Sequence, residues 1–188
     1  CVTVCDITKR LPDYMLNADM IYTDPPWSLG NVNGFITKAG KKDYINDFPE
    51  FATALFSRVA EICPSVCYME IGKQNLKMFR DRLAALFPVI QEWEIVYYRK
   101  NHCYLLRGGY GPQPYDFTGI DDAETPRRAI LVENPRCVAD LCTGQGLTAV
   151  AAHCLGKRFV GTELNKRRLA VAIDRVNKLG GRYEGPVS

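Results

Sequence analysis

The sequence predicts an α/β protein with a Rossmann-like, mostly parallel sheet and helices on both faces. Two observations support this prediction. Short apolar runs of strand length alternate with segments whose apolar residues recur at helical spacing, which is typical of parallel sheets built from strand–helix–strand units. Two polar motifs also follow directly after apolar runs, and ligands of such sheets bind at the carboxyl ends of the strands.

The predicted elements of the first half of the chain rest on apolar runs and on prolines that end helices. Residues 2–5 and 18–23 are short apolar strands. Residues 28–46 are expected to form a long loop, because they hold three glycines, three asparagines and three lysines. The remaining elements are a helix over 48–62 that ends before Pro64, a buried strand over 66–71, an amphipathic helix over 76–87 that ends at Pro88, and a β-branched and aromatic strand over 89–99.

The second half begins with an irregular excursion over residues 101–125, predicted from its paired glycines and its prolines. A short helix over 127–132 follows, capped by Thr125 with Pro126 in the first turn. In the last third of the chain, predicted strands and helices alternate regularly. Its elements are a strand over 137–141, a glycine-rich turn, a helix over 147–155 that ends at Gly156, a strand over 158–161 and a helix over 166–178.

Bulk properties restrict the class of protein. The 188 residues suit one well-filled domain over residues 1–188, with 47% hydrophobic and 24% charged residues. The net charge of +3 permits a polyanionic partner without requiring one. No apolar run reaches the length of a membrane span and no signal peptide is recognised, so we expect an intracellular, cytoplasmic protein with no membrane contact.

The eight cysteines are interpreted as free thiols in a reducing cytosol. Several lie in or beside apolar runs, where cysteine packs like a small hydrophobe. The alternative is a zinc site that uses Cys63 and Cys67, or His102 and Cys103. Paired CxxC spacing is absent and the chain has only two histidines, so we expect no metal.

The most informative motif is Asp24-Pro25-Pro26-Trp27, directly after the strand over 18–23. The two prolines fix φ and donate no N–H, so they suit the end of a strand. A carboxylate, backbone carbonyls and a flat ring suit a planar amine, whose N–H groups they accept and whose face they stack on. The motif predicts an enzyme that acts on the exocyclic amine of a nucleobase; the alternative is a proline-kinked loop with Trp27 packed into the core.

The second motif is the turn Asp-Leu-Cys-Thr-Gly-Gln-Gly over residues 140–146. Its glycines allow a tight turn and close approach of a ligand. Glu163, at the end of the next strand, suits the two hydroxyls of a ribose. The pattern also fits a dinucleotide site, with Ala149 as its third small residue. Too few residues follow Glu163 for the rest of a dehydrogenase, so a single nucleoside with a small charged tail, S-adenosylmethionine, fits better.

Together these motifs resemble the beta class of S-adenosylmethionine-dependent amino-methyltransferases, in which the catalytic motif precedes the cofactor motif. Residues 24–27 match the catalytic motif in its adenine-N6 form, whereas cytosine-N4 enzymes usually begin it with serine. Residues 140–146 look like the cofactor loop, usually Asp-Pro-Phe-x-Gly-Ser-Gly, and residues 159–163 match the strand that ends in the ribose-binding acid. Cys5-Asp6-Ile7 is also similar to the messenger-RNA adenosine methyltransferases, where the Asp-Ile pair contacts the cofactor adenine; the alternative for Asp6 is a local cap.

The resemblance implies the class I methyltransferase fold in permuted order and transfer of a methyl group from S-adenosylmethionine to adenine N6, in DNA rather than RNA. Alternatives are an RNA adenosine enzyme, a cytosine-N4 DNA enzyme, an inactive cofactor-binding subunit, and a nicotinamide-dependent oxidoreductase. The implied catalytic residues are Asp24, Pro25, Pro26 and Trp27. The implied cofactor-binding residues are Asp6, Ile7, Asp24, Asp140, Cys142, Thr143, Gly144, Gln145, Gly146, Thr148, Glu163 and Leu164.

DNA enzymes of this class commonly insert a target-recognition domain, and residues 101–125 are too short to hold one. Sequence choice is therefore expected to rest on loops, on a homodimer or on a partner subunit. Basic groups position a nucleic-acid backbone without reading its bases. The expected phosphate contacts are Lys38, Lys41, Lys42, Arg99, Lys100, Arg107, Arg127 and Arg128; the alternative for each is a solvated basic face.

Overall fold

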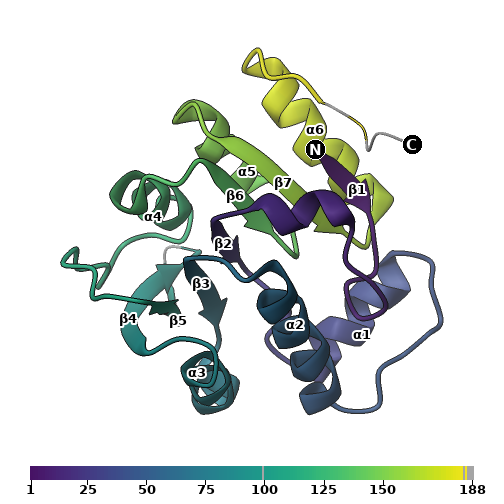
Figure 1. Cartoon of the computed structure of the whole chain (residues 1–188). Helices are drawn as coiled ribbons and strands as arrows, with labels where there is room; N and C mark the ends of the chain where they lie inside the picture. Colours follow the sequence, from purple (N-terminus) through teal and green to yellow (C-terminus); the bar gives the residue numbers. More distant parts are fainter. Residues whose placement is uncertain (99, 184, 186–188) are drawn as a thin grey trace.

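The computed structural model describes residues 1–98, 100–183 and 185. Within this part, seven strands form one sheet in the order β1-β7-β6-β2-β3-β5-β4 (Figure 1). The strands are β1 (Val2–Val4), β2 (Met20–Thr23), β3 (Val66–Ile71), β4 (Val89–Tyr97), β5 (Asn101–Gly109), β6 (Cys137–Asp140) and β7 (Arg158–Glu163). All neighbours from β1 to β3 are parallel, and β5 is antiparallel to both β3 and β4. The predicted mostly parallel α/β sheet is confirmed.

Helices cover both faces of this sheet (Figure 1). They are η1 (Asp13–Asn17), α1 (Leu29–Lys38), α2 (Phe48–Ile62), η2 (Lys73–Asn75), α3 (Leu76–Ala84), α4 (Thr125–Glu133), α5 (Leu147–Cys154) and α6 (Lys166–Lys178), with η marking 3-10 turns. Successive side chains of a strand point to opposite faces. On β2, Ile21 accordingly joins the core under η1 and α1 to α3, while Met20 and Tyr22 join the core under α4 and α5.

Three predicted elements match the observed bounds to the residue, namely α2, β3 and α6. Most others differ by a few residues at their ends, where side-chain pattern is least informative. The predicted cap of α4 is wrong by one position. Glu124 is the N-cap, and Thr125 is the first helical residue, with its hydroxyl donating to the carbonyl of Asp121 at 2.9 Å.

The predicted loop over residues 28–46 is wrong in its first part, because Leu29–Lys38 forms helix α1, whereas residues 39–46 form no helix or strand. Ser28 caps it by accepting a hydrogen bond from the N–H of Asn31 at 3.2 Å. Val32 and Ile36, one turn apart, are buried. The burial of Val32 and Ile36, together with the Ser28 cap, outweighs the low helix propensity of the two glycines in this helix.

The irregular excursion expected over residues 101–125 is also wrong in its first part, which forms strand β5. Gly108, taken as a sign of a loop, lies within the strand. A Cβ at this position would lie 2.5 Å from the ring of Phe87. The glycine therefore provides space for a core phenylalanine rather than a turn, a distinction that requires the tertiary partner.

None of the helices in the described part of the chain is both long and apolar enough to span a membrane.

Candidate active site

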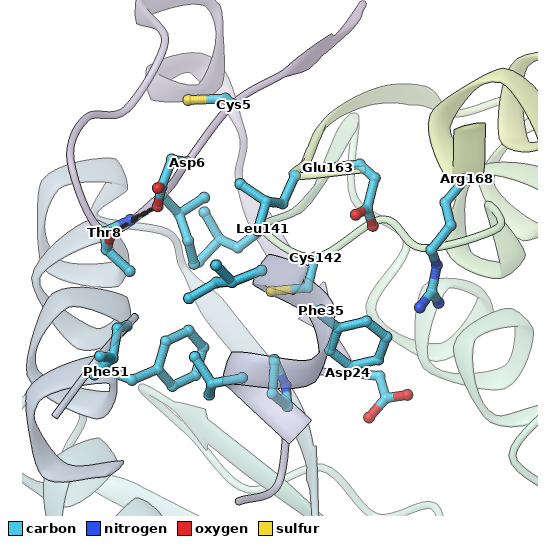
Figure 2. A pocket seen from close by; sticks show the side chains of 16 residues that line it. Cys5, Asp6, Thr8, Asp24, Phe35, Phe51, Leu141, Cys142, Glu163 and Arg168 are labelled. Carbon is cyan, nitrogen blue, oxygen red and sulfur yellow. Dashed lines mark hydrogen bonds between the residues drawn. The ribbon is translucent and has the colours of Figure 1, made fainter. Parts of the chain in front are cut away.

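Two adjoining cavities lie where the parallel strands end. We call the first the apolar pocket; beside three acids and an arginine it has an apolar wall made of Ile7, Val32, Phe35, Ile36, Ile45 and Phe51 (Figure 2). We call the second the polar cleft; its lining includes Asp24, Glu70, Asp122, Asp140 and several basic residues. Asp24 lines both cavities, so it stands at their junction.

The structure brings most of the predicted cofactor residues together. The apolar pocket is lined by Asp6, Ile7, Asp24, Pro26, Cys142, Glu163 and Leu164. The polar cleft is lined by Asp24, Lys38, Asp140, Cys142, Thr143, Gly144, Gln145 and Thr148. The predicted residues Pro25, Trp27 and Gly146 line neither of these two cavities.

Asp24 is accessible from the cavities although protein surrounds it closely. The indole N–H of Trp27 donates to its Oδ1 at 2.9 Å. Burial raises the pKa of Asp24 to about 7, and the charges of Asp140 and Asp122 add to this rise, while the Trp27 hydrogen bond and Arg168 oppose it. A carboxyl with this pKa can both accept and release a proton at neutral pH.

Trp27 is held in place by its neighbours. The side-chain amide of Asn75 donates to its carbonyl at 2.8 Å, and the Trp27 and Tyr97 ring centroids are 4.6 Å apart. Tyr98 continues this aromatic row, 4.4 Å from Tyr97, and is 72% exposed. Three tyrosines, Tyr22, Tyr97 and Tyr98, line the polar cleft, and the Trp27 ring packs against Tyr97 without lining the cleft itself.

A second carboxyl lies behind Asp24, on the neighbouring strand β3. Glu70 is buried, and its Oε1 accepts a hydrogen bond from the hydroxyl of Tyr22. Burial, together with the negative charge of Asp24, holds the pKa of Glu70 well above its ordinary value. Glu70 is not among the site residues predicted from the sequence. The sequence feature that could have revealed Glu70 is a single acid in an otherwise apolar, buried strand. Burying a carboxyl group is costly unless it has a partner or a functional role.

The glycine-rich turn between β6 and α5 is tied to the end of β7. The N–H of Gly144 donates to Glu163 Oε2 at 2.8 Å, and the N–H of Thr143 donates to the carbonyl of Thr162 at 2.9 Å. Within the turn, the N–H of Cys142 donates to Asp140 Oδ1 at 3.0 Å. Burial raises the pKa of Asp140 to about 6. The turn thus presents Thr143, Gly144 and Gln145 to the cleft as one fixed unit.

Asp6 both caps a turn and lines the apolar pocket. Its Oδ1 accepts from the N–H of Thr8 at 3.1 Å and from the Thr8 hydroxyl at 2.6 Å (Figure 2). Lys41 Nζ lies 3.9 Å from its Oδ2. The cap alternative for Asp6 is therefore realised, and the same residue still faces the pocket.

Arg168 and Phe35 are lining residues that the sequence analysis missed. The Arg168 guanidinium lies 4.8 Å from the centre of the Phe35 ring, and Figure 2 shows it reaching between Glu163 and Asp24. Its Nε is buried and has no hydrogen-bond partner within the described part of the chain. Arg168 lies in the first turns of the helix that follows the predicted acid Glu163, and the predicted loop concealed Phe35. A buried donor without a partner is costly, so this atom suits an acceptor supplied by a ligand.

Four of the eight expected phosphate contacts are engaged in ion pairs, namely Lys41, Arg107, Arg127 and Arg128. Arg127 and Arg128 lie 2.9 and 3.0 Å from the same carboxylate oxygen of Glu124. Lys42 and Lys100 are exposed and line neither cavity, whereas Lys38 lines the polar cleft. Arg99 lies outside the described residues.

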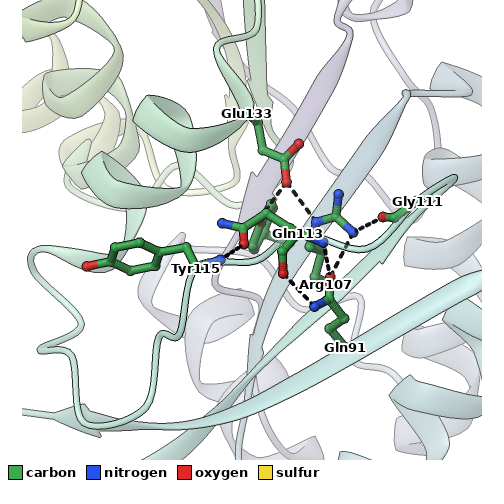
Figure 3. Close-up of polar contacts among 7 residues, drawn as sticks. Gln91, Arg107, Gly111, Gln113, Tyr115 and Glu133 are labelled. Carbon is green, nitrogen blue, oxygen red and sulfur yellow. Dashed lines mark hydrogen bonds and ion pairs between the residues drawn. The ribbon is translucent and has the colours of Figure 1, made fainter.

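Arg107 corrects one of these expectations. Its side chain is buried and pairs with Glu133, Nε to Oε1 at 2.7 Å (Figure 3). Its Nη1 also donates to Gln91 Oε1 at 3.1 Å and to the carbonyl of Gly111 at 2.8 Å. Arg107 therefore fastens the chain after β5 to β4 and α4, and it is a structural residue rather than a phosphate contact.

No cluster of three or more histidine, cysteine or acidic side chains placed to hold a metal is found among the residues that the structure describes. The expected burial of the cysteines is confirmed for Cys5, Cys67, Cys103 and Cys137 but is wrong for Cys63 and Cys154, which are exposed.

No family model matches this chain, and a search of curated proteins gives no significant match. Solved structures do match. M1.HpyAVI has a TM-score of 0.62 at 16% identity, with 94% of this chain and 98% of that chain covered; a complex of M1.HpyAVI with SAM also matches. TTHA0409, the "Putative DNA Modification Methylase" of Thermus thermophilus, has a TM-score of 0.66 at 17% identity, with 96% of each chain covered.

The PvuII DNA methyltransferase, which is cytosine-N4-specific, has a TM-score of 0.59 at 11% identity, with 100% of this chain and 87% of that chain covered. TTHA0409 has also been solved in complex with S-adenosyl-L-methionine. At these identities the likeness establishes the fold. The chain has the class I methyltransferase-like α/β fold.

Proposed function

We propose that this chain transfers a methyl group from S-adenosylmethionine to the exocyclic N6 amine of adenine in DNA. The observation that carries the proposal is the position of Asp24, at the end of β2 and at the junction of the apolar pocket and the polar cleft. An acceptor at such a junction can hold an amine from one cavity against a group bound in the other. The similarity in fold to the PvuII DNA methyltransferase and to the putative DNA modification methylase TTHA0409 supports the same reaction class.

The residues present fit the cofactor. The apolar wall of Ile7, Val32 and Phe35 suits a flat purine, and Glu163 suits its ribose. The buried Nε of Arg168, which lacks a partner in the described structure, suits the carboxylate of the amino-acid tail. The surrounding acids, Asp24 and Asp140 among them, suit a sulfonium cation. When bound, S-adenosylmethionine supplies an electrophilic methyl group.

The chain's own residues would orient and activate the amine. The lone pair of adenine N6 is delocalised into the ring, so the amine is a poor nucleophile. Asp24 would accept one N–H through Oδ2, because Oδ1 already accepts from Trp27. The Pro25 carbonyl is proposed to accept the other N–H, although Pro25 lines neither of the two cavities. Both bonds strengthen as the nitrogen gains positive charge, which lowers the barrier.

Two further roles follow from the geometry. The target base would stack on Tyr97, whose ring is supported by Trp27 at 4.6 Å, so we assign Trp27 a positioning role. Asp24, with a pKa of about 7, would take the proton that the methylated amine releases. A base in a duplex would first have to leave the helix to reach Asp24.

Mass spectrometry of nucleosides tests this function. The purified chain is incubated with S-adenosylmethionine and a mixture of DNA and RNA, and the digested nucleosides are analysed. The proposal expects N6-methyldeoxyadenosine as the main product. N4-methyldeoxycytidine, the product expected by analogy with the PvuII enzyme, or N6-methyladenosine would overturn the choice of base or polymer. Absence of any methylated nucleoside would favour the inactive subunit.

The pH dependence of cofactor affinity provides a separate prediction. A cation bound beside Asp24 favours the ionised carboxylate, so binding below the free pKa of about 7 must release a proton. We expect S-adenosylmethionine to bind up to about tenfold more tightly at pH 8 than at pH 6, since one proton is linked to binding. The measurement is titration calorimetry.

S-adenosylhomocysteine is the matched control, because it lacks the sulfonium charge. Its affinity should change much less over the same range, and Asp24→Asn should remove most of the dependence for S-adenosylmethionine. Equal pH dependence for the two ligands would show that the acids do not sense the sulfonium.

A further inference from the structure

The polar cleft has two rims of opposite charge. Lys38, Arg167 and Arg175 line one rim, at the end of α1 and along α6, and we call them the basic rim. Asp121 and Asp122 line the cleft on the segment that leads into α4. Asp24 lines the same cleft and follows β2 in the middle of the sheet, whereas α6 packs on β1 and β7 to one side and Asp121 pairs with Val96 of β4 at the other edge, so Asp24 lies between the two rims. Any polyanion that reaches Asp24 is therefore attracted to one side of the cleft and repelled from the other.

The residues of the basic rim combine two properties: they line the polar cleft, and they form no ion pair within the described part of the chain. Within the described part of the chain, none of the ion pairs involves Lys38, Arg167 or Arg175. In contrast, Arg127 and Arg128 share Glu124. These three cations line the polar cleft, as Asp24 does, so a ligand can bind them without breaking an ion pair within the protein.

The rim is also held in place. Asn165 is the N-cap of α6; its side-chain oxygen accepts from the N–H of Arg167 at 2.9 Å, and its amide donates to the carbonyl of Lys38 at 2.9 Å. Asn165 therefore joins the end of α1 to the start of α6. Arg175 lies about 12 Å further along the helix, from the rise per residue, and its Nη1 donates to the carbonyl of Gln145 at 3.1 Å.

We infer that the basic rim binds the phosphates of the nucleic-acid strand that carries the target base. This inference rests on the proposed function and replaces most of the phosphate contacts predicted from sequence with a different surface. The acidic side keeps the backbone away from Asp121 and Asp122, so the strand lies over α1 and α6 with its base directed toward Asp24. Contacts of this kind position the strand without reading its sequence.

The test is fluorescence anisotropy of a labelled single-stranded oligodeoxynucleotide at several salt concentrations. The variant is the full chain with Arg167→Gln and Arg175→Gln. We expect its affinity to fall at least about tenfold, and the slope of log K against log salt to become shallower by about 1.4, since each phosphate contact on a single strand contributes about 0.7. The matched control, Arg127→Gln with Arg128→Gln, loses the same charge and should keep the wild-type slope.

Calorimetry with S-adenosylhomocysteine distinguishes failure of the basic-rim inference from failure of the proposed function. Unchanged affinity for this ligand shows that the rim variant retains its fold and cofactor pocket. If the rim variant keeps the wild-type slope, or the α4 control loses as much, the basic rim is not the phosphate surface, and the proposed function stands. If the wild-type chain binds no oligonucleotide, both the rim and the nucleic-acid substrate are overturned.

Discussion

Replacement of Asp24 by asparagine is expected to lower kcat for methyl transfer by at least about 100-fold, the range typical for loss of a group that stabilises developing charge. The carboxylate faces both cavities, and its negative charge is favourable only when the amine nitrogen becomes positive. Asparagine keeps the size and the oxygen that Trp27 bonds, but it removes the charge and the proton acceptor. The loss should therefore fall on kcat rather than on substrate affinity.

The measurement is transfer of tritiated methyl groups to DNA, with calorimetry of S-adenosylhomocysteine as the control for a folded site. Affinity for that ligand should stay within about threefold of wild type, since it lacks the sulfonium that the charge of Asp24 would favour. Asp43→Asn is a matched control, because Asp43 lies on the surface with Lys9 and lines neither cavity. Full activity in Asp24→Asn would refute the assigned role of the carboxylate.

The sequence was most informative where local pattern and tertiary context agree. Strand β3 and helices α2 and α6 could be placed to the residue, because their apolar residues repeat with the period of the element. Asp24 and Glu163 could be assigned to the site because Asp24 follows β2 and Glu163 ends β7, two strands that run parallel to their neighbours. The ends of parallel strands meet at one edge of the sheet, so this inference needs only the order of elements.

The rest of the site depends on contacts that no local pattern encodes. Helix α1 contains two glycines and forms because Ser28 caps it and the core buries Val32 and Ile36. Asn33, which lies in the predicted loop, exchanges two hydrogen bonds with the backbone of Ile45 and fixes the following segment. Phe35 reaches the apolar pocket from this helix.

The partners of the charged residues likewise could not be predicted from the local sequence. Composition identified basic residues but not their partners, so Arg107, which is buried, and Arg128, which pairs with Glu124, could not be separated from the unpaired Arg167. Glu70 could be located on its strand, but its contact with Tyr22 and its closeness to Asp24 depend on the pairing of β2 with β3.

Gly146→Ala is expected to destabilise the protein by about 2–5 kcal/mol, the sum of a strained backbone and an overpacked contact. Gly146 has φ of +83°, in the left-handed region that favours glycine. A Cβ here would lie 2.7 Å from Cβ of Ala172 and 2.9 Å from its Cα, so helix α6 would have to move. The glycine predicted to let a ligand approach therefore serves to let α6 approach the turn.

Gly156→Ala separates the two contributions, because Gly156 also has a positive φ, +67°, but no atom lies within 4 Å of the place that a Cβ would occupy. It should cost only about 1–2 kcal/mol, the backbone part alone. Urea unfolding measures both variants, and equal losses would show that contact with α6 is not limiting. Adding Ala172→Gly to Gly146→Ala should recover part of the loss, since the closer of the two clashes is removed.

The same turn carries Thr143, Gly144 and Gln145 to the polar cleft, so a shift of the turn should also disturb the cofactor site. The folded Gly146→Ala protein is therefore expected to bind S-adenosylhomocysteine more weakly than Gly156→Ala does, as measured by calorimetry. Stability and cofactor affinity would then depend on the same contact between the turn and α6.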